Sequence, residues 1–103
     1  MLNEFVKTDN TGFNYRWNGK VSAGEEIILR LPLVTANKRG VNDIGWQIDG
    51  DARLFATVSD FREDSTVIWQ EIFDDEGINK TASAVKLIGG AGVSDVWLRV
   101  ILN

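Results

Sequence analysis

The sequence contains no cysteine and no histidine. Without cysteine the chain forms no disulfide and no thiolate metal site. Without histidine it lacks the usual zinc ligand and any side chain that ordinarily titrates near neutral pH. A pair of carboxylates could still catalyse hydrolysis, but such a pair must face one bond across a cleft, for which so short a chain has little room. We therefore expect a protein that is not an enzyme and that uses no cofactor and no metal.

Basic residues, proline and long apolar runs are also scarce. The 11 Lys and Arg residues against 15 Asp and Glu give a net charge of −4, whereas nucleic-acid binding needs clustered positive charge. The longest apolar runs, such as residues 27–29, are far too short to span a bilayer. The N-terminus has neither the basic start nor the apolar segment of a secretory signal. These features predict no nucleic-acid partner, no membrane partner and no export by that route.

Short segments of alternating apolar and polar residues fill the chain instead. In residues 96–102 the residues Val96, Leu98, Val100 and Leu102 fall on one face of an extended strand. No window of a dozen residues keeps a helical period, so we predict no long helix. Eight strands are predicted, at residues 3–8, 13–17, 26–34, 44–49, 52–59, 66–73, 82–88 and 96–102.

Eight short, evenly spaced strands predict one all-β domain over residues 1–103, an antiparallel β-sandwich. An eight-stranded jelly roll fits best and an immunoglobulin-like sandwich is second. Residues 81–103 are predicted to form a hairpin in the middle of a sheet, reversing through positive φ angles at Gly89, Gly90 and Gly92. Asn18-Gly19 and Asp49-Gly50 predict two more hairpin turns, and Pro32 predicts an edge strand or a bulge.

Large aromatic residues are the first candidates for a binding surface. Trp46 and Trp69 share the alternation phase of apolar neighbours on their strands, which predicts that both lie in the core. Trp97 opposes the apolar face of its strand and is the tryptophan expected to be partly exposed. Tyr15 and Trp17 are candidates for a contact patch or, as for most large aromatics in small proteins, for the core.

Acidic residues gather in the predicted turns. They are Asp49, Asp51, Asp60, Glu63, Asp64, Asp74, Asp75 and Glu76. Calcium takes several hard oxygen ligands at one point, but the spacing of an EF-hand loop is absent. Carboxylates beside glycine are also ordinary turn chemistry, and we expect solvated turns here.

Three short patterns in the second half carry a resemblance to a known class of protein. They are the W-x-I-x-G-D turn at residues 46–51, the Trp69-Gln70 pair, and N-K-T-A-S-A at residues 79–84. The second half resembles the small all-β structural proteins of tailed bacteriophages, in particular jelly-roll proteins that decorate or staple the capsid. The resemblance implies a virion component that binds the major capsid protein, self-associates and carries no catalytic residue.

The resemblance therefore implies a non-enzymatic decoration or cement protein on the outer surface of a phage capsid, made in the cytoplasm of the bacterial host. The residues expected to contact the partner are Tyr15, Arg16, Trp17, Lys38, Arg39 and Trp97. Two alternatives stay open. One is a carbohydrate-binding β-sandwich module, which would need exposed aromatic side chains. The other is a structural subunit of another bacterial or phage assembly, such as a tail.

Overall fold

The computed structural model describes residues 2–8, 13–31, 41–58, 67–73, 76–78 and 82–102. These residues form nine strands and no helix, so the prediction of an all-β chain is confirmed. None of them belongs to a helix that could cross a bilayer. The strands are β1 (Leu2–Glu4), β2 (Val6–Lys7), β3 (Asn14–Val21), β4 (Glu26–Arg30), β5 (Val41–Asp49), β6 (Arg53–Thr57), β7 (Gln70–Ile72), β8 (Ala84–Ile88) and β9 (Ser94–Leu102).

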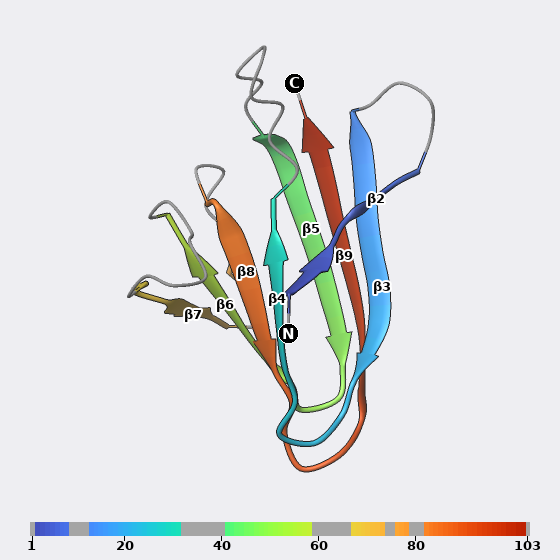
Figure 1. Cartoon of the computed structure of the whole chain (residues 1–103), viewed down its shortest axis with the longest axis vertical. Coiled ribbons are helices and arrows are strands. Elements are labelled where there is room, and N and C mark those ends of the chain that lie inside the picture. The colour runs from blue at the N-terminus through green and yellow to red at the C-terminus, as the bar shows by residue number, and fades with distance from the viewer. Residues whose placement is uncertain are drawn as a thin grey trace.

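The strands form two sheets that face each other as a β-sandwich (Figure 1). One sheet has the order β1-β4-β8-β6-β7 and the other has the order β2-β3-β9-β5. Within the described strands every neighbouring pair is antiparallel except β1 with β4. Three connections, from β3 to β4, from β5 to β6 and from β8 to β9, cross between the sheets at one end of the molecule (Figure 1).

Alternate residues of the central strands supply the core. On β9 the predicted apolar face is confirmed, because Val96, Leu98, Val100 and Leu102 are all nearly fully buried. Leu87 of β8 comes from the opposite sheet and belongs to the same cluster. The opposite face of each central strand is left at the surface, and it is there that a binding site can form.

The C-terminal hairpin predicted for residues 81–103 is wrong. β8 pairs with β4 and β6, whereas β9 pairs with β3 and β5 in the other sheet. Both strands do lie in the middle of a sheet, as predicted. Among the described glycines, positive φ angles occur at Gly24 and Gly50 and not in the 89–93 connection. Glycine is needed at 89 because a side chain there would overlap the backbone carbonyl of Ser22.

The turn predicted at Asn18-Gly19 is also wrong, because β3 runs through both residues and pairs with β9 along its whole length. Gly19 serves packing, since a Cβ atom there would lie 2.6 Å from Cζ2 of Trp17. The turn at Asp49-Gly50 is present, with a φ of 136° at Gly50, but it joins the two sheets and forms no hairpin. Pro32 lies outside the described residues.

The single strand predicted at residues 3–8 is two strands, one in each sheet. β1 and β2 are separated at Phe5, whose partly buried side chain packs against the core. This break accounts for the ninth strand, because the chain leaves one sheet and enters the other where an apolar residue turns inward.

Candidate functional site

The outer face of the four-stranded sheet carries the clearest candidate site. Strand register places Trp97 of β9 between Asn18 of β3 and Gln47 of β5. One row further along β9, Arg99 lies between Arg16 of β3 and Gly45 of β5. Residues directly opposite on an antiparallel pair have Cβ atoms about 4.5–5.5 Å apart. The alternation of side chains along β3, β9 and β5 therefore gathers these polar and aromatic side chains at one surface.

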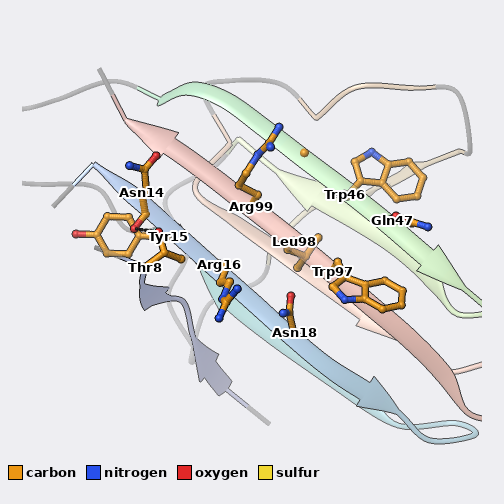
Figure 2. A pocket seen from close by; sticks show the side chains of 11 residues that line it. Thr8, Asn14, Tyr15, Arg16, Asn18, Trp46, Gln47, Trp97, Leu98 and Arg99 are labelled. Carbon is orange, nitrogen blue, oxygen red and sulfur yellow. Dashed lines mark hydrogen bonds between the residues drawn. The ribbon is translucent and has the colours of Figure 1, made fainter. Parts of the chain in front are cut away.

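These side chains surround a groove of about 620 Å³ (Figure 2). The residues of the two rows line it, and Thr8, Asn14 and Tyr15 line its other end. We call this feature the outer-face groove. Trp97 is its large apolar side chain at the surface, with 42% of its area exposed. Neither of these two rows of residues across the sheet contributes a carboxylate to the lining of the groove.

The two arginines of the groove are held differently. Nη2 of Arg99 donates a hydrogen bond of 3.2 Å to Oδ2 of Asp43. A Cβ atom at Gly45 would lie 3.3 Å from the same nitrogen, so the glycine gives the guanidinium room to lie over β5. The side chain of Arg16 makes no hydrogen bond or ion pair with another residue in the described part of the chain. Figure 2 shows the two side chains pointing to opposite flanks of β9.

Beyond the groove, the same face of the sheet carries a lysine whose charge is paired with a carboxylate. Nζ of Lys20 lies 2.7 Å from Oδ1 of Asp95, its partner in register across β3 and β9. Both side chains are well exposed, and an exposed pair of this kind contributes at most about 1 kcal/mol. Lys20 is therefore a surface cation whose charge is already matched, unlike that of Arg16.

The outer face of the five-stranded sheet has a different character. Nζ of Lys86 lies 4.8 Å from the ring centroid of Trp69 and 5.3 Å from that of Phe55. The guanidinium of Arg53 lies 5.1 Å from the Phe55 centroid. Cations at these distances are attracted to the ring faces. Both aromatic rings on this face, Phe55 and Trp69, therefore already have a cationic neighbour.

Large apolar side chains remain exposed beside β7, the end strand of the five-stranded sheet. Ile68 is 80% exposed, while Val58 and Phe73 are each 60% exposed. Phe73 is anchored through its backbone, because its N–H donates to Oε1 of Glu76 and its carbonyl accepts from the N–H of Glu76. We call Val58, Ile68 and Phe73 the β7 apolar residues.

A bidentate ion pair joins β6 to β7 near these residues. Nε of Arg53 donates to Oε2 of Glu71 at 3.0 Å, and Nη2 donates to Oε1. These hydrogen bonds hold the pKa of Glu71 below its ordinary value of about 4.3. The pair therefore fixes β7 to the sheet when the carboxylate is ionised.

Glu71→Gln is expected to lower stability near neutral pH and to have little effect in acid. Because the pKa of Glu71 is lower in the folded than in the unfolded chain, its stabilisation is complete above the unfolded pKa and is lost as the pH falls through the folded pKa. Urea unfolding of both proteins at about pH 7 and about pH 3 measures this. Arg53→Gln, which removes the other partner, should show the same pattern, whereas a difference independent of pH would contradict it.

Three of the residues predicted to contact a partner line the outer-face groove, namely Tyr15, Arg16 and Trp97. The predicted partial exposure of Trp97 is confirmed. Lys38 and Arg39 lie outside the described residues. The groove also contains Arg99, Asn18 and Gln47, which the sequence did not single out. Arg99 shares the face of Trp97 because it lies two residues further along the same strand. Asn18 and Gln47 lie on other strands, and their register is not revealed by one sequence.

The other aromatic residues singled out in the sequence lie in different environments. Tyr15 and Trp17 lie on the inner face of β3, in register with the buried Val100 and Leu98, and pack against the core. Both are partly buried and Tyr15 also lines the outer-face groove, so the partner contact expected of these two residues stays a prediction. Trp46 packs against the core as predicted, and its Nε1 donates to the carbonyl of Glu76 at 3.1 Å. Trp69 is outside the core cluster and lies against Lys86.

The acidic residues of the predicted turns give no candidate metal site in the described part of the chain. No group of three Asp or Glu residues that could hold a metal ion occurs among the residues the structure describes. Oδ2 of Asp51 accepts a hydrogen bond of 3.0 Å from the N–H of Ala91, so this carboxylate joins two connections at the end of the sandwich. Asp60, Glu63, Asp64, Asp74 and Asp75 lie outside the described segments.

Comparison with known proteins gives no further constraint. No family model, no curated relative and no solved structure matches this chain.

Proposed function

We propose that this chain is a non-enzymatic structural protein of a tailed-phage virion, which binds the outer surface of the capsid and stabilises it. The major capsid protein is the proposed partner, and further copies of the chain are proposed neighbours on the shell. The single observation that carries the proposal is the exposure of the β7 apolar residues. The resemblance of the second half to capsid decoration proteins gives that exposed surface a specific partner.

Exposed apolar side chains beside an edge strand favour association with another surface. Single exposed apolar residues are common on monomers, but several large ones in a short stretch mark interaction sites. Ile68 and Phe73 flank the two ends of β7 and Val58 follows β6, its neighbour in the sheet. Fully burying one such side chain contributes about 1.5–3 kcal/mol. Two or three of them therefore supply the apolar centre that a stable interface needs.

The strand pairing supports a jelly roll, the fold of the proteins that the chain resembles. A jelly roll is a two-stranded ribbon folded over itself, so its eight strands pair first with last, second with seventh, third with sixth and fourth with fifth. Counted from β3, the pairs β3–β9, β4–β8 and β6–β7 fit this scheme. The third-with-sixth pair of the scheme has no counterpart among the described strands, but Trp46 of β5 donates a hydrogen bond to the carbonyl of Glu76 in the β7–β8 connection.

A decoration protein of this kind acts by differential binding. If it binds the assembled shell more tightly than the free capsid subunit, it stabilises the shell by mass action. No bond is made or broken, so the lack of histidine and cysteine is compatible with the role. Its contribution depends on the area and fit of the contact, and a few anchoring side chains dominate such contacts.

The combined substitution Ile68→Ser and Phe73→Ser is expected to weaken capsid binding at least about tenfold, since 1.4 kcal/mol corresponds to a factor of ten. Co-sedimentation of the purified protein with capsids from the same phage measures the affinity. Val93→Ser is the matched control, because Val93 is 61% exposed and lies in the distant β8–β9 connection. Binding by this control should equal that of the parent protein.

Three results would count against the proposal. Failure of the parent protein to bind capsids or to appear in purified particles would overturn the assigned function. Binding to tails and not to capsids would favour a tail subunit. Equal binding by the parent and the double variant would show that the β7 apolar residues are not the contact.

A further inference from the structure

We propose that the outer-face groove binds an acidic saccharide, a sugar that carries a carboxylate. This site goes beyond capsid binding, because it lies on the four-stranded sheet and the β7 apolar residues flank the end strand of the other sheet. The proposal depends on the kind of groups that line the groove and on their positions relative to Trp97.

The indole of Trp97 supplies a flat apolar surface inside a polar surround. One face of a pyranose ring presents mainly C–H groups, which carry partial positive charge and pack against the electron-rich face of an aromatic ring. Trp97 lies on β9, between two paired strands, so the backbone that holds it is fixed on both sides. Its exposure alone would be ordinary, and the polar side chains beside it are what distinguish this surface.

Two amides flank the indole in the same row. Asn18 lies opposite Trp97 on β3 and Gln47 lies opposite it on β5. Each amide offers two donor hydrogens and an acceptor oxygen. A sugar hydroxyl both donates and accepts, so it can satisfy either end of an amide. A pyranose stacked on Trp97 therefore has matched hydrogen-bonding groups on both sides.

The next row explains why the sugar should be acidic. Arg16 and Arg99 are donors only, and no carboxylate lies opposite them in their row. Arg99 is paired with Asp43, whereas Arg16 has no partner among the described residues. A ligand carboxylate beside Arg16 would give this guanidinium an ionic partner and could form a bidentate contact with it.

The size and polarity of the groove favour a saccharide over a protein segment. Its volume of about 620 Å³ falls within the 300–1,000 Å³ that is typical of sites for small ligands. A protein contact usually buries about 800 Å² on each side around an apolar centre. The lining combines the indoles of Trp97 and Trp46 with amides and guanidiniums, which is a composition suited to the C–H face, the hydroxyl groups and the carboxylate of an acidic sugar.

Glycan arrays carrying uronic-acid, sialic-acid and neutral saccharides, followed by calorimetric titration of the best acidic saccharide, test the proposal. The parent protein should bind acidic saccharides. Trp97→Ala should weaken that binding at least about tenfold, and Trp97→Phe should retain part of it because a flat ring remains. Arg16→Gln should reduce affinity for the acidic saccharide toward that for its neutral analogue. Circular dichroism confirms that each variant is folded.

Lys20→Gln is the matched control for Arg16→Gln. Lys20 lies on the same strand and the same face, but it is paired with Asp95 and does not line the groove. Its binding should be unchanged, and the β7 double variant should also bind saccharide normally.

The saccharide proposal is overturned if no array saccharide binds, if only neutral ones bind, or if Trp97→Ala binds as well as the parent protein. Loss of capsid binding by Trp97→Ala without any saccharide binding would instead identify the groove as a protein contact.

Discussion

Replacing Leu98 with alanine is expected to lower the free energy of unfolding by about 2–5 kcal/mol, the usual cost of this truncation in a packed core. Leu98 is 2% exposed and lies at the middle of β9. Strand register places Trp17 on one side of it and Trp46 on the other, all facing the core. Two large rings held by flanking strands cannot easily collapse into the space that the lost methyl groups leave.

The effect is large relative to the whole stability, because domains of this size unfold with only about 5–15 kcal/mol. Urea unfolding followed by tryptophan fluorescence measures it, provided that the denaturant slope stays constant. Val93→Ala is the control, since Val93 is exposed in the β8–β9 connection, and surface changes usually stay within about 0.5 kcal/mol. A loss below about 1 kcal/mol for Leu98→Ala would contradict the central position of β9.

Replacing Gly89 with alanine is expected to cost about 3 kcal/mol or more, through steric overlap with the main chain. The added methyl group would overlap the carbonyl of Ser22, and Ser22 belongs to the connection between β3 and β4. The N–H of Gly89 donates to the carbonyl of Glu25 at 2.8 Å, and its own carbonyl accepts from the N–H of Gly24 at 3.3 Å. Relief of the overlap must therefore disturb hydrogen bonds between the two connections, each contributing about 0.5–1.5 kcal/mol.

Gly92→Ala provides the matched comparison. Gly92 lies in the same connection, but a Cβ atom there would meet nothing within 4 Å, and its φ angle is not positive. Alanine at this position should be neutral or should stabilise the chain by up to about 1 kcal/mol, because it restricts the unfolded state. Equal unfolding midpoints for the two variants would show that the connections at this end of the sandwich do not pack closely.

The two proposed binding surfaces belong to different sheets, which has a consequence for experiment. A chain seated on a capsid through the β7 apolar residues leaves the outer-face groove accessible for a saccharide. Particles carrying the parent protein should therefore capture acidic saccharide, and particles carrying Trp97→Ala should not. Each surface can also fail separately, since neither set of substitutions touches the residues of the other.

The sequence by itself determined the class of fold and the burial pattern of individual strands. Period-2 alternation is a local property of an extended chain, so it correctly predicted the inward face of β9 and the exposure of Trp97. The absence of histidine and cysteine likewise limited the available chemistry without any knowledge of the fold. Both inferences require only residue type and spacing.

Only the tertiary structure decided which strands are neighbours. A glycine-rich reversal has the same composition whether the strand after it pairs with the strand before it or crosses to the facing sheet. For that reason the sequence predicted a hairpin, whereas the connection from β8 to β9 joins the two sheets. Asn18-Gly19 has a turn composition, yet it lies inside β3 because pairing with β9 overrides local preference. The outer-face groove depends on the register of three strands, which long-range hydrogen bonds set. For that reason Trp97 could be found from its own strand, whereas Asn18 and Gln47 could not.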